Sequence, residues 1–354
     1  MKCNNAYKHI HWLAIALMAV LPFFLPCHAG ADVINARAAV VIDGSTGRIL
    51  FGKNPNTRLQ PASTTKLVTA MVVLDRIDPD EMVTISKHAA TTPSVTPRLR
   101  AGEQLSVRDL LNLALIRSVN SAAVALAEAV SDTEDEFVEL MNNKVSALGA
   151  ENTKFINASG LPGEGQHITA YDLTFIMKEA LRYPVIREII NTRDNKIYTE
   201  NGRGLSVRNT NHLLWNDEDV VGGKTGFTRS AGHCFVFAVQ KGEGVLISSI
   251  LGERVRGHIW GDSGVLLQTG EDVLANRREP ELYYTADAED PIKVVTSKKP
   301  RRASAKKQLA SSKYAKDKNK SEAAPKKQAK RKLRARQKEN LVGVDAKKAA
   351  GRIS

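Results

Sequence analysis

Residues 63–74 read STTKLVTAMVVL and contain neither glycine nor proline. From Leu67 onward every residue except Thr69 is apolar, so the segment predicts a helix that is buried on most sides. The residues just before it, Gln60-Pro61-Ala62, place Ser63 at the N-terminus of this helix. Because a helix of this kind must be enclosed by other elements, the sequence on either side of it decides the fold.

Strands are predicted near both ends of the central part of the chain, and helices between them. The segments typical of strands are apolar and bounded by turn residues: 38–42, 48–51, 220–225, 234–239 and 245–251. The segments with helical periodicity are 107–116, 122–130, 137–148, 170–181 and 262–275. We therefore predict one α/β domain over residues 32–278, in which the two terminal segments share an antiparallel sheet.

The positive charge of the chain is concentrated in its C-terminal part. The 354 residues carry a formal net charge of +13. Residues 291–354 hold 22 Lys and Arg against 4 Asp and Glu, a net charge of +18, so the rest of the chain has −5. This composition predicts a disordered basic tail over 291–354, joined by a linker over 279–290, and it does not indicate a nucleic-acid-binding domain.

The N-terminal residues have the three parts of an export signal. Lys2 and Lys8 give a basic start, an apolar run extends from Trp12 to Leu25, and the small residues AGA occupy positions 29–31. We therefore predict a signal peptide over residues 1–31. The expected place of action is the periplasm or the cell-wall space.

Three short motifs carry the chemistry of the predicted domain: STTK at 63–66, SVN at 118–120 and KTG at 224–226. Lys66 follows Ser63 by one helical turn, on the same face. A serine hydroxyl needs a base to become a nucleophile, and a lysine is a base only when burial or a second cation lowers its pKa. Lys224 can be that cation. The free N–H groups of a helix N-terminus can stabilise an oxyanion, so the motifs predict acyl transfer through a serine.

This set of motifs resembles that of penicillin-binding proteins and class A β-lactamases. The longer segments LQPASTTK (59–66), NASGLP (157–162) and GGKTGFT (222–228) are similar to the low-molecular-weight D-alanyl-D-alanine carboxypeptidases. The similarity spans roughly residues 35–275. It implies the transpeptidase fold of penicillin-binding proteins and β-lactamases, an antiparallel sheet with helices.

The resemblance also implies a role for individual residues. The catalytic set that it implies is Ser63, Lys66, Ser118 and Asn120. The substrate-binding set that it implies is Lys224, Thr225, Gly226 and Phe227. In this scheme Ser63 is acylated and Lys66 is its base. Lys224 binds the terminal carboxylate of the substrate, and the backbone N–H groups of Ser63 and Phe227 form the oxyanion hole.

The expected activity is that of a serine-type D-Ala-D-Ala carboxypeptidase that trims peptidoglycan stem peptides through an acyl-enzyme on Ser63. No metal or cofactor is expected, and β-lactams are expected covalent inhibitors. For the basic tail the expected partners are anionic wall polymers or lipid headgroups rather than nucleic acid.

Three other functions stay open. A DD-endopeptidase would cut D-alanyl cross-links on the same scaffold. A class A β-lactamase needs a glutamate on the loop after the second motif, and the only glutamate of residues 161–167 is Glu164, between two glycines. A non-catalytic wall-binding protein would not need all three motifs intact. A phosphate-binding loop at 223–225 is excluded by Glu218, and the five histidines after residue 31 form no zinc motif.

Overall fold

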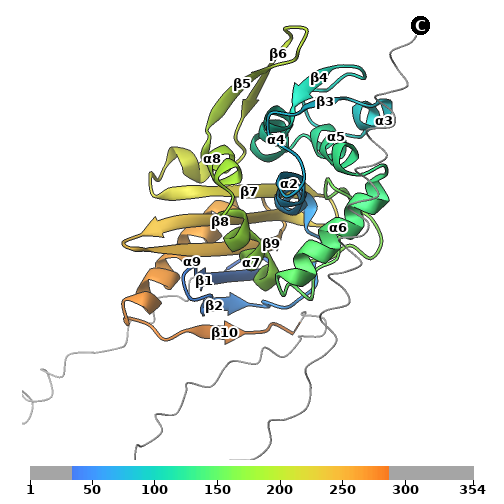
Figure 1. The fold of residues 1–354 in the computed structure, drawn as a ribbon. Coiled ribbons are helices and arrows are strands. Elements are labelled where there is room, and N and C mark those ends of the chain that lie inside the picture. Colours follow the sequence, from blue (N-terminus) through green and yellow to red (C-terminus); the bar gives the residue numbers. More distant parts are fainter. Residues whose placement is uncertain (1–33, 287–354) are drawn as a thin grey trace, which may run out of the picture. The chain divides into compact units, whose positions relative to one another are not determined.

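The apolar strands from the two ends of the sequence meet in one six-stranded sheet (Figure 1). The computed structural model describes residues 34–286, all within one structural unit. The strands of the sheet, in spatial order, are β10 (Glu281–Tyr283), β2 (Ile49–Lys53), β1 (Ala38–Asp43), β9 (Gly244–Glu253), β8 (Gly232–Lys241) and β7 (Val220–Thr228). Neighbouring strands are antiparallel except β10 and β2, which are parallel. The predicted α/β architecture with a sheet shared by the terminal segments is confirmed.

Helices cover both faces of this sheet. On one face α9 (His258–Leu274) packs against β9, β2 and β1. On the other face α7 (Ala170–Ala180) packs against β9 and β1, and α8 (Pro184–Asn191) against β7 (Figure 1). The remaining helical elements are η1 (Ala62–Thr65), α2 (Lys66–Leu74), α3 (Lys87–Thr91), α4 (Val107–Ile116), α5 (Asn120–Val130), α6 (Glu134–Ala147) and η2 (His212–Trp215).

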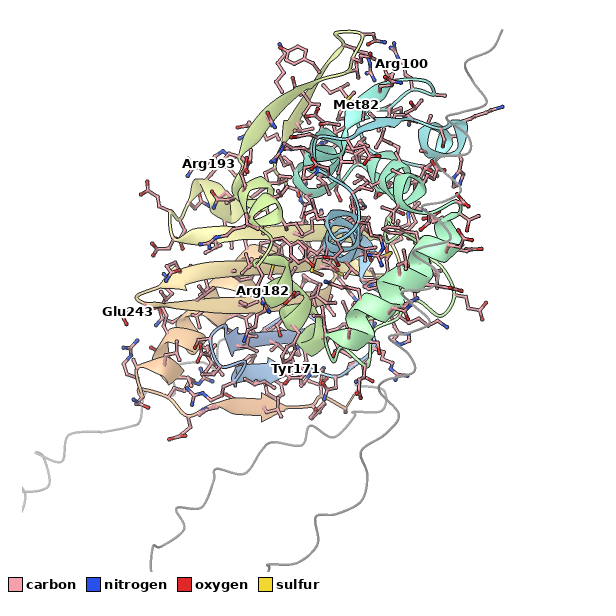
Figure 2. All side chains as sticks on the ribbon, viewed as in Figure 1. Met82, Arg100, Tyr171, Arg182, Arg193 and Glu243 are labelled. Atoms are coloured by element: carbon pink, nitrogen blue, oxygen red, sulfur yellow. The ribbon has the colours of Figure 1, made fainter. Side chains whose placement is uncertain are left out.

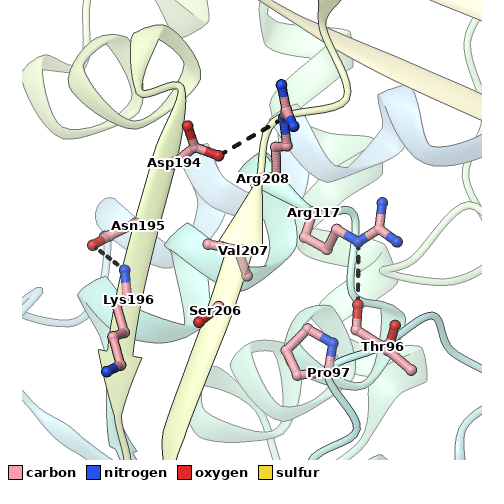
Figure 3. A pocket seen from close by; sticks show the side chains of 9 residues that line it. All are labelled: Thr96, Pro97, Arg117, Asp194, Asn195, Lys196, Ser206, Val207 and Arg208. Carbon is pink, nitrogen blue, oxygen red and sulfur yellow. Dashed lines mark hydrogen bonds and ion pairs between the residues drawn. The ribbon is translucent and has the colours of Figure 1, made fainter.

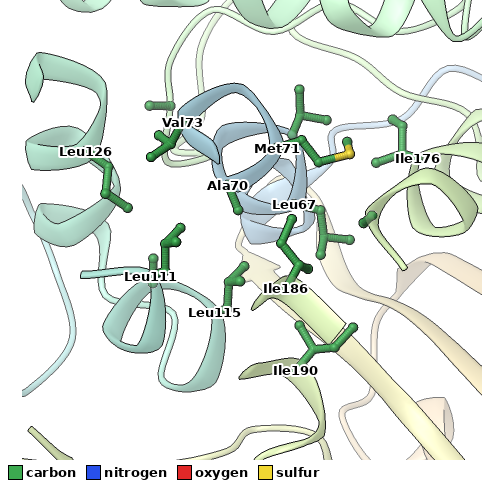
Figure 4. Packing of buried hydrophobic residues seen from close by; sticks show 14 of the residues in the cluster. Leu67, Ala70, Met71, Val73, Leu111, Leu115, Leu126, Ile176, Ile186 and Ile190 are labelled. Carbon is green, nitrogen blue, oxygen red and sulfur yellow. The ribbon is translucent and has the colours of Figure 1, made fainter. Parts of the chain in front are cut away.

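The helix α2 lies at the centre of the larger core. Every residue of α2 except Leu74 is buried. Figure 4 shows Leu67 and Met71 of this helix enclosed by side chains from its neighbours, which are Leu111 and Leu115 of α4, Leu126 of α5, Ile176 of α7 and Ile186 of α8. Complete enclosure explains why the sequence of α2 has almost no polar position.

The sheet separates two hydrophobic clusters because side chains alternate along each strand. In β1, Val40 and Ile42 face the cluster around α2, whereas Ala39 and Val41 face the cluster around α9. Figure 2 shows side chains filling the layer between the helices and the sheet. With both faces covered, β1 is apolar at successive positions, from Ala38 to Ile42, instead of alternating with polar residues.

Two small two-stranded antiparallel sheets extend from the helical layer. One consists of β3 (Met82–Thr84) and β4 (Gln104–Ser106), with α3 between them in the sequence, and the other is the hairpin of β5 (Asp194–Tyr198) and β6 (Gly204–Arg208). They are joined by the Arg203 side chain, whose Nε and Nη2 donate to the Glu103 carboxylate at 2.6 and 2.5 Å. The sequence did not predict either small sheet, since their strands are short and rich in polar residues.

The structure also differs from the predicted linker over 279–290, because β10 lies within it. The Leu282 side chain of β10 packs on Gly52 of β2, where an added Cβ would come within 2.6 Å of it. The absence of a side chain at Gly52 therefore admits this sixth strand. The predicted signal peptide (1–31) and basic tail (291–354) lie outside the described residues. Within residues 34–286 no helix is long and apolar enough to cross a membrane.

Candidate active site

The first motif folds into a tightly constrained turn at the start of α2. Ser63 lies in η1, and Lys66 is the first residue of α2. Ala62, just before the serine, has a left-handed backbone with φ of 48°. Gly160 packs directly on it, since a Cβ at position 160 would lie 1.8 Å from the Ala62 carbonyl oxygen. Only glycine fits there, and the packing fixes the backbone that carries Ser63.

Lys66 is enclosed and has three oxygen neighbours. Its Nζ lies 2.9 Å from Ser63 Oγ, 2.7 Å from Asn120 Oδ1 and 2.5 Å from the Ser159 carbonyl oxygen. The side chain is buried, with 1% of its surface exposed. Burial, and then the charge of Lys224, hold the pKa of Lys66 well below its usual value of 10.5. A lysine in this state can accept the Ser63 proton at a pH where an exposed lysine cannot.

The second motif contributes a hydroxyl and an amide at the start of α5. Ser118 has a left-handed backbone with φ of 67°, which turns the chain before the helix begins at Asn120. The Asn120 backbone N–H donates to Ser94 Oγ at 2.8 Å, and its Nδ2 donates to the Pro93 carbonyl oxygen at 2.8 Å. These two bonds orient the amide so that Oδ1 faces Lys66.

The third motif lies on the edge strand β7 and brings a second buried lysine to the site. Lys224 has no exposed surface. Its Nζ donates to Ser118 Oγ at 3.0 Å and to the Thr225 carbonyl oxygen at 2.8 Å. Burial lowers the pKa of Lys224 to about 7. The ammonium and neutral forms are therefore both accessible near neutral pH.

The strand β7 approaches η1 more closely than a side chain would permit. A Cβ at Gly226 would lie 2.7 Å from the backbone nitrogen of Ser63. Beside it, Thr225 Oγ1 donates to Thr210 Oγ1 at 2.6 Å. Since β7 and η1 are in contact here, backbone groups of residues 226 and 227 lie next to the serine.

Phe227 lies near the C-terminal end of β7. Phe227 is 56% exposed, and its ring stacks on the His233 ring of β8, with the ring centres 4.3 Å apart. The predicted contribution of Phe227 is its backbone N–H, and its side chain forms a flat apolar surface beside the serine.

These residues open into a cavity of about 450 Å³, the catalytic cavity. The predicted site residues that line it are Ser63, Ser118, Asn120, Thr225, Gly226 and Phe227. The two predicted lysines lie behind this lining, bonded to Ser63 and Ser118. All eight predicted site residues are thus brought together in one place.

Several groups at the site were not found from the sequence. The other residues that line the catalytic cavity are Val95, Arg117, Thr210, His233, Arg256, Ile259 and Trp260. Ser94 and the Ser159 carbonyl act indirectly, by orienting Asn120 and binding Lys66. Among these residues, Arg117 could have been noticed from the sequence, because it directly precedes the second motif. The rest come from distant segments and belong to no motif.

The chain between Asn157 and His167, which includes Glu164, contributes a backbone carbonyl to the site and not a carboxylate. Ser159, within the segment 157–162, supplies the backbone oxygen that binds Lys66. Glu164 is exposed, and it does not line the catalytic cavity. The arrangement therefore supports acylation of a serine, and among the described residues no glutamate lines the cavity at Ser63.

Comparison with known proteins gives a consistent result. A family model described as D-alanyl-D-alanine carboxypeptidase, peptidase S11, matches residues 26–255. The D-alanyl-D-alanine carboxypeptidase DacF of Bacillus subtilis is 36% identical over 223 residues, which are 62% of this chain and 57% of DacF. A D-alanyl-D-alanine endopeptidase of Pseudomonas aeruginosa is 39% identical over 235 residues, 64% of this chain and 74% of that protein. The chain thus spans little more than half of DacF.

Solved structures with the same fold include a carboxypeptidase and a transpeptidase. A D-alanyl-D-alanine carboxypeptidase from Mycobacterium tuberculosis matches with a TM-score of 0.64 and 30% identity, over 69% of this chain and 94% of that one. The Streptomyces K15 DD-transpeptidase matches with a TM-score of 0.64 and 29% identity, over 68% of this chain and 98% of that one. The fold is that of the penicillin-binding proteins.

Proposed function

Because the chain belongs to the peptidase S11 family of D-alanyl-D-alanine carboxypeptidases, we propose that it hydrolyses the D-Ala-D-Ala end of peptidoglycan stem peptides. One observation carries the proposal: Lys66 Nζ lies 2.9 Å from Ser63 Oγ, and the pKa of this lysine is held well below its usual value. A serine with such a neighbour has what nucleophilic catalysis requires.

In the proposed acylation, neutral Lys66 takes the proton of Ser63 Oγ, which attacks the carbonyl carbon of the penultimate D-alanine. The negative charge that develops on the carbonyl oxygen is stabilised by the backbone N–H groups of Ser63 and Phe227. The C–N bond then breaks as the leaving nitrogen receives a proton through Ser118. The products of this step are an ester on Ser63 and free D-alanine.

In the proposed deacylation, water attacks the ester carbon and Lys66 again accepts a proton. The ester bond to Ser63 breaks, Oγ regains its proton, and the shortened stem peptide leaves. A β-lactam is attacked by Ser63 in the same way: the C–N bond of its lactam ring breaks, the ring opens, and the protonated leaving nitrogen stays attached to the acyl group. With Glu164 remote from the ester, we expect the penicilloyl-enzyme to be long-lived.

The terminal carboxylate of the substrate is proposed to bind at Lys224 and Thr225. In the free enzyme the pKa of Lys224 is about 7, because burial disfavours its charged form. A carboxylate bound beside it favours the ammonium form, so substrate binding raises that pKa. Asn120, oriented by Ser94, is proposed to hold the substrate amide.

The proposal is tested with the Ser63→Ala variant. This variant should release no D-alanine from a pentapeptide and should take up no label from a fluorescent penicillin, while its circular dichroism spectrum and unfolding midpoint stay those of the wild type. A matched control is Ser146→Ala on the exposed surface of α6, which should keep both activities. Penicillin labelling of Ser63→Ala at wild-type stoichiometry would show that the nucleophile is another residue.

We also propose that residues 1–31 direct export and that the basic tail over 291–354 holds the enzyme at anionic wall polymers or lipid headgroups. The support is compositional, a net charge of +18 over the tail. Sedimentation with purified sacculi should fall steeply as salt is raised, because screening shortens the reach of surface charges. A chain ended at residue 290 should lose that sedimentation. Equal sedimentation of both chains at every salt concentration would reject the tail as the anchor.

A further inference from the structure

Thr210 lines the catalytic cavity and belongs to none of the three motifs. Its hydroxyl oxygen lies 2.6 Å from that of Thr225, the threonine of the third motif. Thr225 is one of the two side chains to which the proposed function assigns the substrate carboxylate, and Lys224 is the other. A residue bonded this closely to a carboxylate-binding side chain can determine how well that side chain binds.

The backbone around Thr210 is fixed by the residues on both sides of it. Both neighbours are buried asparagines, Asn209 with 5% of its surface exposed and Asn211 with none. Asn209 Oδ1 accepts a hydrogen bond from the Asn211 backbone N–H at 2.9 Å, across Thr210. Asn211 Oδ1 accepts from the Leu213 backbone N–H at 3.0 Å and caps η2. Asparagine side chains that bond to the backbone two residues on stabilise a turn, so the Thr210 hydroxyl is held beside Thr225.

Thr210 is also bonded to the segment that leads into the second motif. Its backbone N–H donates to the carbonyl oxygen of Ile116, the last residue of α4, at 3.3 Å. The next residue, Arg117, is held by its Nε, which donates to the Thr96 carbonyl oxygen at 3.2 Å (Figure 3). Ser118 follows directly in the sequence. Thr210 therefore connects the second motif to the third, through its backbone on one side and its hydroxyl on the other.

The hydroxyls of Thr210 and Thr225 have two protons between them, which limits the hydrogen bonds that they can form. A threonine hydroxyl donates one hydrogen bond and can accept others, whereas a carboxylate only accepts. In the free enzyme the Thr225 hydroxyl donates to Thr210. A carboxylate that binds at Thr225 needs this proton for itself. The bond between the two threonines then persists only if Thr210 becomes the donor and Thr225 Oγ1 the acceptor.

We propose that Thr210 is a positioning residue for carboxylate recognition, which donates to Thr225 Oγ1 when the ligand accepts the Thr225 proton. The bond from Thr210 keeps Thr225 Oγ1 at the cavity wall. It also makes Thr225 a stronger donor, because hydrogen bonds in a chain polarise one another. Thr210 acts through Thr225 and does not bind the ligand itself. This inference rests on the proposed function, since that function places the carboxylate at Thr225.

The test uses Thr210→Val, because valine keeps the branched shape of threonine and removes the hydroxyl. The measurement is the acylation rate of Ser63 as a function of ligand concentration, for a penicillin and for the same penicillin with its carboxylate esterified. The half-saturating concentration of the free-carboxylate penicillin should rise about threefold to tenfold, the effect of one hydrogen bond. The maximal rate should change little, because the proton acceptor is intact. The ester should react as it does with the wild type, and Thr210→Ser should restore the affinity for the penicillin.

A double-mutant cycle separates an effect through Thr225 from direct contact with the ligand. In a Thr225→Ala background, Thr210→Val should cause no further loss of penicillin affinity, because the side chain through which Thr210 acts is already absent. Losses that add in the double variant would show that Thr210 binds the ligand directly, and they would overturn its assignment as a positioning residue.

The matched control is Thr84→Val on β3. Thr84 is exposed, and its Oγ1 accepts a hydrogen bond from Gln104 Nε2 at 3.1 Å. It does not line the catalytic cavity. The control therefore removes a hydrogen-bonded threonine hydroxyl away from the site, and both ligands should react with it as they do with the wild type.

The remaining outcomes bear on one or the other of the two proposals. Wild-type affinity of Thr210→Val for the free-carboxylate penicillin overturns the role of Thr210. An equal loss for the penicillin and its ester also overturns it, because such a loss indicates a distorted cavity and not a weaker carboxylate contact. A wild-type enzyme that is acylated by neither ligand overturns the proposed function itself.

Discussion

Two lysines share one site, and each is withdrawn from water, although burial is costly for a charged amine. They have different oxygen partners: Lys66 contacts Ser63, the proposed nucleophile, and Lys224 contacts Ser118 and the Thr225 carbonyl. The burial of each is the main cause of its lowered pKa, and the charge of Lys224 lowers the pKa of Lys66 further. Because the partners differ, we expect the removal of Lys66 and the removal of Lys224 to change different properties of the enzyme.

Replacement of the two lysines should therefore separate rate from binding. Lys66→Ala should slow acylation by about a hundredfold to ten-thousandfold for every ligand, because the proton acceptor is lost. Lys224→Ala should weaken binding chiefly of ligands with a free carboxylate. The acylation rate as a function of ligand concentration gives both the maximal rate and the binding affinity. The two ligands compared are a penicillin and the same penicillin with its carboxylate esterified. Lys87→Ala, on the exposed surface of α3, is the control. If Lys66→Ala keeps the maximal rate, Lys66 is not the base.

The pH profile should report Lys224 as well. Above a pH of about 7 the free enzyme loses the ammonium form of Lys224, so kcat/KM for a carboxylate ligand should decline as pH rises through that value. The same lysine has no carboxylate to bind in a penicillin ester, whose acylation should show no such decline. Neutral Lys66 is needed for both ligands, so both rates should fall in acid. Identical alkaline limbs for the two ligands would contradict the assigned role of Lys224.

At the scale of elements, the site depends on the contact between β7 and η1. Gly226→Ala would place a Cβ 2.7 Å from the Ser63 nitrogen, and backbone atoms cannot yield as a flexible side chain does. We expect a loss of acylation rate of about tenfold or more, since misplacement of reacting groups by about 1 Å is costly. Gly264→Ala in α9 is the matched control, because its Cβ would meet nothing within 4 Å. Wild-type acylation by Gly226→Ala would show that this approach is dispensable.

The elements that the sequence predicted share long apolar patterns. Residues 107–116 were predicted as a helix and are α4 without any shift. The start of α6 was predicted three residues late, because its first turn, Glu134 to Glu136, is entirely acidic and has no apolar position to signal a helix. Acidic side chains favour a helix N-terminus, and Thr133 caps it, its hydroxyl accepting the Glu136 N–H at 3.2 Å.

The residues of the site likewise include some that the sequence predicts and some that it does not. Seven of the eight predicted residues belong to the three motifs, and the eighth, Phe227, directly follows the third motif. The Ser159 carbonyl could not be predicted as a partner of Lys66, because every residue has a carbonyl and only the fold decides which one a lysine meets. Arg256 and Thr210 likewise lie far from the motifs in sequence and reach the cavity only through the sheet and the hairpin.

At the scale of the whole molecule, a buried carboxylate joins the first described residues to the last helix. Asp262 of α9, 1% exposed, accepts hydrogen bonds from the backbone N–H groups of Asn35 at 3.1 Å and Ala36 at 3.0 Å. Asp262→Asn replaces an acceptor by a donor there. It should lower the free energy of unfolding by about 1–3 kcal/mol, the cost of buried groups left unpaired.

Denaturant unfolding measures this loss, with Asp80→Asn at an exposed position as the control. Penicillin acylation by the folded Asp262→Asn variant should stay near the wild-type rate, because Asp262 does not line the catalytic cavity. A variant as stable as the wild type would show that the two backbone bonds find other acceptors.

The order of the strands in the sheet also determines when the site can assemble as the chain is made. Strands β1 and β2 emerge from the ribosome early, but β1 lies between β2 and β9, and β9 follows about two hundred residues later. Contacts of such long sequence separation form slowly and only after the intervening chain is complete. Lys224 lies on β7, late in the same order, so a chain synthesised only through α2 has Ser63 and Lys66 but not the second lysine. The complete site can therefore assemble only when the C-terminal strands close the sheet.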